Sequence, residues 1–92
     1  MRAASLFAIT LLLAVSLAAH ARGTARFGNR LVSQGDSVGS VRQVAGTPDR
    51  IVTLENEFGA ATGERWEYYR SDGSTVLVTF RNGRVQDVEE VR

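Results

Sequence analysis

The fold is decided by residues 74–91, which read STVLVTFRNGRVQDVEEV. In the first half, large apolar residues occupy every second position, the period of a half-buried strand: Val76, Val78 and Phe80. Asn82-Gly83 follows and is a preferred pair for a two-residue β-hairpin turn, because both residues take a positive φ. In the second half, valines recur every three residues, which predicts a bulge or a strand end: Val85, Val88 and Val91.

Two further strands are expected before this hairpin. Residues 51–58 are rich in side chains that are common in strands, and residues 59–64 have the composition of a loop. Residues 65–70 form the next strand, which a turn at Asp72-Gly73 connects to the hairpin. Alternation along this strand separates two pairs of side chains onto opposite faces: Trp66 and Tyr68 on one, Glu67 and Tyr69 on the other.

A short helix is expected upstream of the strands. Ser37 or Asp36 can cap its start by accepting a backbone N–H bond. Apolar side chains then recur at spacings of three and four, which predicts one buried stripe: Val38, Val41, Val44 and Ala45. Gly46 fits the left-handed position that ends a helix, and Pro48 prevents its continuation.

The order of these elements predicts the α+β class, with one short helix packed on a four-stranded antiparallel β-meander. We place this domain at residues 30–92, with Trp66 in the core beneath the helix. Residues 22–29 are polar and Gly-rich, so we expect them to form a flexible N-terminal segment.

The first 21 residues have the pattern of a cleaved secretory signal peptide. Met1-Arg2 supplies the positive start, residues 6–19 are mostly apolar, and Ala19-His20-Ala21 is an A-x-A cleavage pattern that ends at Ala21. A transmembrane anchor needs about 20 apolar residues, and a buried helix would need a larger apolar face downstream, so both alternatives are disfavoured. We expect a periplasmic or secreted protein, without a lipid anchor because no Cys follows the cleavage site.

Composition limits the chemistry that remains. The chain has 92 residues, no Cys and a net charge of +1, which excludes a multidomain enzyme and a disulfide scaffold and disfavours nucleic-acid binding. After cleavage no His, Met or Lys remains, so the common neutral-pH base, the amine nucleophile and the soft metal ligands are missing. We therefore expect no enzyme activity, no cofactor and no metal.

Several residue pairs have a functional and a structural interpretation. Glu55 and Glu57 would share a strand face and could act as an acid–base pair, but we favour a solvated face because nothing nearby in the sequence would raise a pKa. Asp36 and Ser37 lack a base that could activate the hydroxyl, and helix capping explains both. Four arginines on or beside adjacent strands could form a basic patch, although the interspersed acids favour a mixed, salt-bridged surface: Arg65, Arg70, Arg81 and Arg84.

The chain also resembles a known structural plan. The residues that carry the resemblance are Gly35-Asp36-Ser37, Val41, Gly46-Thr47-Pro48, Trp66-Glu67-Tyr68, and residues 80–88, which include Phe80 and Gly83. They are similar to the small outer-membrane assembly lipoproteins of the BamE/SmpA type. They resemble more closely an uncharacterised family of exported proteobacterial proteins, a domain of unknown function. The resemblance implies an α+β envelope protein and supplies no catalytic residue.

Two departures from these families bear on the expectation. Phe27 and Ala45 stand where the exported family has two Cys, which implies that burial replaces a disulfide and that the segment around Phe27 lies near the helix end. The lipidation Cys of the assembly lipoproteins is also absent, which argues against their membrane-tethered role.

These observations favour a non-enzymatic, exported protein-interaction module that serves cell-envelope assembly or maintenance. The alternative is a small secreted enzyme inhibitor or ligand-binding domain. The expected partner is an envelope protein of unknown identity. We expect it to contact the sheet face and edge that the helix leaves uncovered, where Tyr69, Arg70 and Arg84 are the candidate contact residues, because Tyr and Arg are enriched at interface hot spots.

Overall fold

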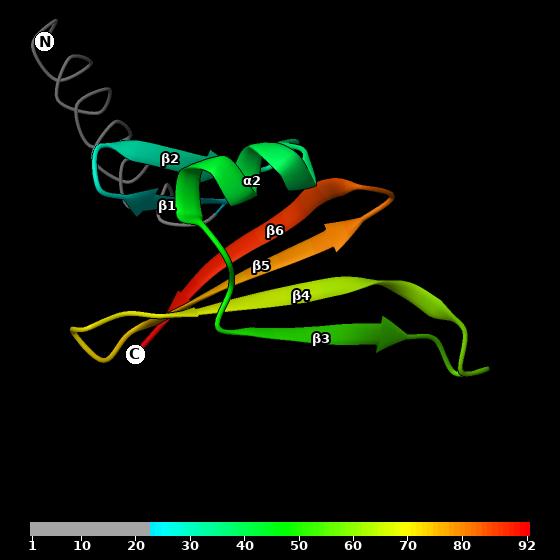
Figure 1. Cartoon of the computed structure of the whole chain (residues 1–92). Helices are drawn as coiled ribbons and strands as arrows, with labels where there is room; N and C mark the ends of the chain where they lie inside the picture. The colour runs from blue at the N-terminus through cyan, green and yellow to red at the C-terminus, as the bar shows by residue number, and fades with distance from the viewer. Residues whose placement is uncertain (1–22) are drawn as a thin grey trace, which may run out of the picture.

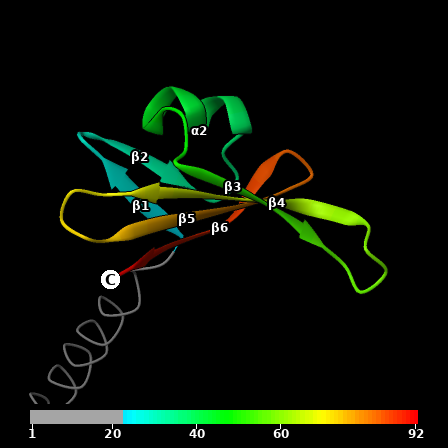
Figure 2. The same cartoon turned by 60° about the horizontal axis from the view of Figure 1, so that its bottom comes forward.

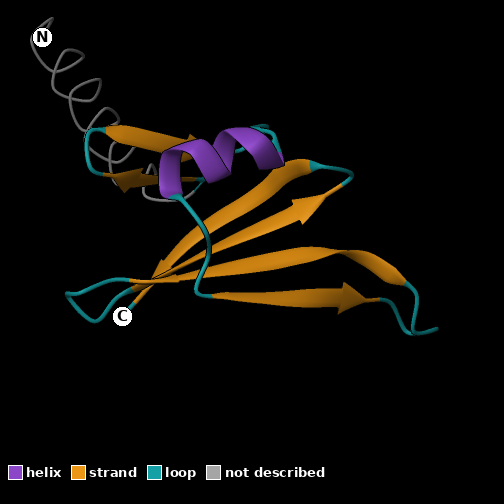
Figure 3. Ribbon diagram, in the orientation of Figure 1, coloured by secondary structure: helices purple, strands orange, loops and turns teal. Residues whose placement is uncertain are grey.

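The computed structural model describes residues 23–92, and these residues form one helix and six strands (Figures 1 and 3). In chain order the elements are β1 (Thr24–Phe27), β2 (Arg30–Ser33), α2 (Val38–Ala45), β3 (Arg50–Glu55), β4 (Ala61–Tyr69), β5 (Thr75–Arg81) and β6 (Arg84–Val91). The predicted α+β class is confirmed. The signal peptide predicted at residues 1–21, with its cleavage residues Ala19 and Ala21, lies outside the described residues.

The main sheet has the strand order β3-β4-β5-β6, and every neighbouring pair is antiparallel, as the sequence predicted. The β3–β4 boundary differs from the prediction, because β3 ends at Glu55 and β4 begins at Ala61. The side chain of Asn56 explains the difference. Its Oδ1 accepts backbone N–H bonds from Phe58 (2.9 Å) and Ala60 (3.0 Å), which closes a turn within the stretch expected to be strand.

The β5–β6 hairpin follows the sequence closely. Asn82 and Gly83 both have positive φ, at 54° and 76°. Thr79 opposes Asp87 while Phe80 opposes Val85, so β6 contains one extra residue at this point. This bulge is the predicted irregularity, and it turns Val85 and Val88 toward the same face, where both are buried.

The N-terminal hairpin β1–β2 corrects the prediction for residues 22–29. The stretch Thr24–Phe27, expected to be flexible, is a strand that pairs with β2 and buries Ala25. The hairpin is also bonded to the outer edge of β6, because the N–H of Gly23 donates to the carbonyl of Val88 (3.2 Å). Backbone bonds hold this strand although its sequence is polar, so the folded domain begins before residue 30.

The helix α2 begins and ends where the sequence indicated. Ser37 Oγ accepts the N–H of Ser40 (3.1 Å), whereas Asp36 accepts the N–H of Ser33 and closes the preceding turn. Gly46 has a φ of 80° and donates to the carbonyl of Arg42. Pro48 follows and is buried, and Val41 is the fully buried residue of the helix.

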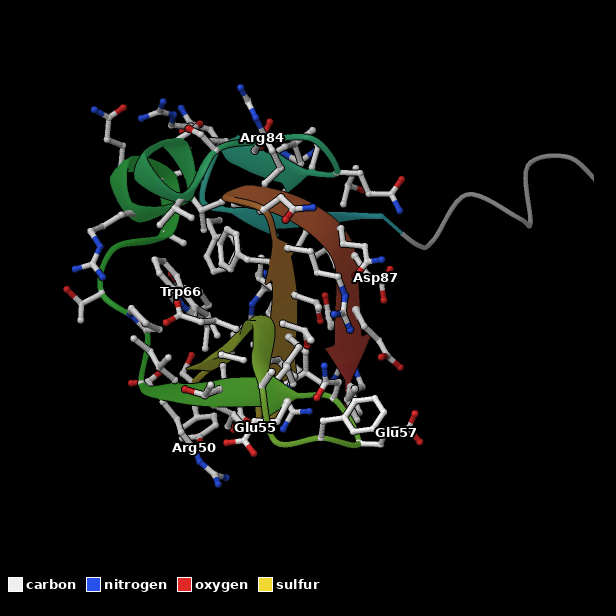
Figure 4. All side chains as sticks on the ribbon, turned by 90° about the vertical axis from the view of Figure 1, so that its right-hand side faces the viewer. Arg50, Glu55, Glu57, Trp66, Arg84 and Asp87 are labelled. Carbon is white, nitrogen blue, oxygen red and sulfur yellow. The ribbon has the colours of Figure 1, made fainter. Side chains whose placement is uncertain are left out.

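One face of the sheet packs against the helix and the β1–β2 hairpin, which lie on the same side (Figure 1). Trp66 is 2% exposed and its side chain lies between sheet and helix, as predicted (Figure 4). Its ring packs against Phe80 with centroids 4.7 Å apart, and the guanidinium of Arg42 lies over it. We call the sheet face that packs against the helix and the hairpin the covered face. Its buried residues are Trp66, Tyr68, Val76, Val78, Phe80, Val85 and Val88.

Tyr68 connects three parts of this core. Its ring packs edge-on against Phe27 of β1, with centroids 5.2 Å apart, and its hydroxyl donates to the carbonyl of Gly46 (2.9 Å). Phe27 and Ala45 both pack against the buried cluster. Burial in a low-dielectric surrounding raises the pKa of Tyr68 to about 12.

Gly63 of β4 allows a close approach between β4 and β5. The register of β3 against β4 shifts beside it, and a Cβ at Gly63 would lie 2.1 Å from the backbone oxygen of Phe80. Only a residue without a side chain fits at this distance.

Candidate functional site

The three predicted contact residues do not form one surface. Tyr69 lies on the sheet face opposite the core and is 54% exposed. The Arg70 guanidinium lies over the ring of Phe27 and forms an ion pair with Glu90 at 3.6 Å. Arg84 follows the turn between β5 and β6 and donates to the carbonyl of Gly35 (3.3 Å). Arg70 and Arg84 therefore contact the N-terminal hairpin and the turn before the helix, whereas Tyr69 lies on the other side of the sheet.

We call the sheet face opposite the core the open face, because among residues 23–92 the helix and the N-terminal hairpin both lie on the other side (Figures 1 and 2). Strand register places its side chains in rows that cross all four strands. One row consists of Arg50, Glu67, Leu77 and Glu89. The next row consists of Val52, Arg65, Thr79 and Asp87.

A buried carboxylate lies on the open face. Glu67 is 7% exposed, although it lies on the side of the sheet away from the core. The Tyr69 hydroxyl donates to its Oε1 (2.9 Å), and Arg65 Nη2 donates to its Oε2 (3.2 Å). Arg50 Nη1 lies 3.9 Å from Oε1. These contacts with Arg50, Arg65 and Tyr69 compensate for the burial of the Glu67 carboxylate, and the four side chains form one cluster.

The cluster fixes the protonation state of its members. The hydrogen bond from Tyr69, with the hydrogen bond from Arg65 and the positive charges of Arg50 and Arg65, lowers the pKa of Glu67 despite its desolvation. The same hydrogen bond raises the pKa of Tyr69, because the negative carboxylate favours the protonated phenol. Glu67 therefore stays ionised at neutral pH and is a weak base, which suits a structural role better than proton transfer.

The tip of the β3–β4 hairpin presents an exposed aromatic ring. Phe58 is 85% exposed, and the hairpin that carries it extends beyond the neighbouring strands (Figures 1 and 2). The turn is held by Asn56, whose side chain accepts the N–H bonds of Phe58 and Ala60, and whose carbonyl accepts from Gly59 (3.0 Å). The ring is therefore positioned by a bonded turn rather than by packing.

The acidic pair Glu55 and Glu57 is not arranged as the sequence suggested. Glu55 is the last residue of β3, and Glu57 lies on the turn, so the two do not share a strand face (Figure 4). Both are exposed. Across residues 23–92 no group of three or more His, Cys, Asp or Glu side chains could hold a metal ion. Within that range no helix is both long and apolar enough to cross a membrane.

The four arginines expected on adjacent strands are dispersed. Arg65 pairs with Glu67 and Arg70 with Glu90, which agrees with a mixed surface. Arg81 donates to the side chain of Gln86 (2.6 Å). No continuous basic patch results.

The two outer edges of the sheet differ. The β6 edge is bonded to the N-terminal segment: Gly35 donates to Val85 (2.9 Å) and Val85 donates to Asp36 (2.8 Å). Among the described strands, none pairs with the outer edge of β3, where Ile51 is exposed. An unpaired edge can hydrogen-bond another chain.

Comparisons with known proteins add no further constraint: no family model, no curated protein and no solved structure matches the chain.

The sequence did not indicate Phe58 or Glu67 as surface features. Phe58 was included in a strand, where an aromatic residue would be expected to pack, and the preceding Asn56 with the following Gly59 was the available turn signal. Two partners of Glu67, Arg65 and Tyr69, lie two positions away on the same strand and so share its face. The third, Arg50, is 17 positions away and opposes Glu67 through strand pairing, which no local pattern indicates.

Proposed function

We propose that the chain is an exported, non-enzymatic module that binds a protein of the cell envelope through the tip of the β3–β4 hairpin. Phe58 is the observation that carries this proposal. A large apolar ring held in water by a hydrogen-bonded turn contributes little to folding, whereas burial in a partner's pocket would remove it from water. The resemblance to exported envelope proteins supports a role in envelope assembly or maintenance.

The charge around Phe58 specifies the kind of pocket. Glu55 and Glu57 precede Phe58 at the end of the hairpin and are exposed, and neither takes part in an ion pair among the described residues. A complementary site would have an apolar floor and a basic rim. The acidic tip also disfavours insertion into an anionic lipid surface, because like charges would repel.

The absence of turnover is proposed on chemical grounds. Residues 22–92 contain no His, Lys or Cys, so the side chains that could act as a general acid or base are carboxylates and tyrosines. The two carboxyl groups with a shifted pKa, Glu67 and Asp72, are both shifted downward, in Asp72 chiefly by the hydrogen bonds from Ser74. A general base that operates near neutral pH needs the opposite shift.

Export is tested separately from binding. Expression of the full chain in a bacterium should give a periplasmic protein whose intact mass corresponds to residues 22–92. A species that retains Met1, or one that begins inside β1, would contradict the predicted cleavage after Ala21.

Binding is tested by placing a photo-crosslinking amino acid at position 58 in cells that naturally make the protein. We expect one discrete covalent adduct with an envelope protein, and no such adduct from position 30. Arg30 is a matched control because it is also exposed but lies on β2. Equal labelling from both positions would refute the tip as the contact. Phe58→Ala should abolish the function without changing the melting temperature.

A second candidate function is inhibition of an enzyme. A projecting hairpin with an apical aromatic ring has the shape of a segment that enters a cleft, which is the observation that favours it. The identity of the crosslinked protein decides between the two: a hydrolase favours inhibition, and an assembly or transport component favours the envelope module.

A further inference from the structure

We propose that the open face binds the open face of a second copy of the chain, as a two-fold symmetric, reversible dimer. The proposal concerns a different surface from the hairpin tip and does not depend on the function assigned to Phe58. It rests on the distribution of charge across the rows of the open face.

The open face is positive on one side and negative on the other. Arg50 on β3 and Arg65 on β4 surround the single acid Glu67, which leaves one net positive charge there. Asp87 and Glu89 on β6 supply the opposite charge, and neither joins an ion pair within residues 23–92. Between the two sides, β5 contributes the uncharged Thr75, Leu77 and Thr79. Arg81 at the end of β5 continues the same alternation, and its side chain donates to Gln86 and to the carbonyl of Thr62. Figure 4 shows Arg50 and Asp87 pointing away from the helix at opposite sides of the sheet.

This pattern complements itself in one orientation. A two-fold axis parallel to the strands, lying between two stacked sheets, places β3 of one copy over β6 of the other. Arg50 then faces the copy's Glu89 twice, once on each side of the axis, because both residues belong to the same row. An axis perpendicular to the strands would place β3 over β3 and oppose like charges, so complementarity selects the parallel axis.

The centre of the open face is already partly removed from water in the single chain. Glu67 is buried within the single chain, and its charge is compensated by Arg50, Arg65 and Tyr69. Around it, the apolar side chains Val52, Leu54 and Leu77 are only half-buried. Covering these groups removes apolar area from water, while Glu67 keeps the partners that it has within its own chain.

The size of the face predicts a weak dimer. Four strands about 4.8 Å apart, paired over about six residues of 3.3 Å each, give a footprint of roughly 400 Å² per copy. Stable complexes bury about 800 Å² of accessible surface per partner, so a small sheet face suits an association that depends on concentration. Salt should weaken it, because the charge pairs lie at the exposed margins.

The experiment uses sedimentation equilibrium on protein purified from cells that express the full chain. The wild type should shift from monomer toward dimer as concentration rises roughly a hundredfold. Arg50→Glu and Glu89→Arg should each be monomeric, because each creates two like-charge contacts per dimer. Mixing the two variants should restore a dimer, because both contacts between unlike chains then join Glu to Arg.

Glu57→Arg is the matched control, since it makes the same charge reversal on the hairpin turn and should leave dimerisation unchanged. Arg50→Gln is a second variant for the case in which Arg50→Glu misfolds. It removes the attraction to Glu89 of the second copy without placing a negative charge beside Glu67, and it should weaken the dimer. The proposal is overturned by a wild type that stays monomeric throughout, by failure of the mixed variants to associate, or by equal disruption from Glu57→Arg. Loss of the dimer through Ile51→Lys alone would assign association to the β3 edge instead. Crosslinking at position 58 is unaffected by each of these outcomes, so the two proposals fail independently.

Discussion

The two faces of the sheet bury their side chains by different means. The covered face is apolar, and its polar atoms are few and satisfied: Trp66 Nε1 donates to Glu64 (3.0 Å) and the Tyr68 hydroxyl donates to Gly46. The open face buries a carboxylate of β4, which lies beside an arginine and a phenol of the same strand and an arginine of the paired strand β3. The covered face is stabilised because folding removes apolar area from water. On the open face, the pairing of charges compensates for the removal of those charges from water.

The two faces contribute unequally to the stability of the fold. Apolar burial does not depend on exact partners and contributes most of the folding free energy. The charge cluster contributes less, because desolvation offsets the attraction, and its one contact between strands joins Arg50 to Glu67, which the register of β3 and β4 places opposite each other.

Trp66→Ala on the covered face should be the most damaging change. Removal of a buried indole costs about 3–5 kcal/mol through lost burial and a cavity, which is comparable with the whole stability of a small domain. Urea or thermal unfolding measures it. A variant that kept its melting temperature but lost a binding activity would show that Trp66 is a surface anchor.

Glu67→Gln on the open face should lower the melting temperature less than Trp66→Ala does. The pKa of Glu67 is lower in the folded chain than its ordinary 4.5, so its contribution is present above that pH and is lost as the pH falls. The variant should therefore show a flatter loss of stability on acidification. Identical acid profiles for variant and wild type would mean that the carboxylate is not coupled to folding.

Tyr68→Phe should have a smaller effect, about 0.5–1.5 kcal/mol, because it removes one hydrogen bond to Gly46. The pKa of Tyr68 is raised from 10.0 to about 12 on folding, so its contribution is full below pH 10 and is lost as the pH rises toward 12. Alkaline unfolding of the variant, followed by circular dichroism, should begin at higher pH. An unchanged alkaline midpoint would assign that transition to another group.

Gly39→Ala provides a reference away from both faces. Gly39 lies inside α2, and a Cβ there would meet no atom within 4 Å. Alanine should stabilise the chain by about 0.5–1 kcal/mol because it loses less backbone entropy in a helix. A melting temperature at or below that of the wild type would indicate that the helix is already limited by its packing.

The sequence could predict those parts of the fold that depend on nearby residues. Asn82-Gly83, the valine spacing of β6 and the caps of α2 act over a few positions, and each was found where expected. β1 was missed although its partners in β2 are only three to nine positions away, because its polar, Gly-rich sequence lacks an apolar strand pattern. The bond from Gly23 to Val88, which ties this hairpin to β6, spans 65 positions, and no local pattern indicates it. For the candidate site, exposure of Tyr69 was anticipated, whereas the roles of Arg70 and Arg84 depend on the unpredicted hairpin.

Gly63 has a consequence for how this sequence can vary. Its neighbour is a backbone oxygen, which cannot rotate away, so every other residue at this position would separate β4 from β5. Gly59 differs: its φ of 81° favours glycine, but the space around it is open, and Asn82 shows that this chain accepts asparagine at a positive φ. In a saturation library selected for folding, position 63 should retain glycine alone, while position 59 should also admit asparagine. Two glycines four positions apart thus impose different limits, one set by collision with a neighbouring strand and the other by backbone torsion.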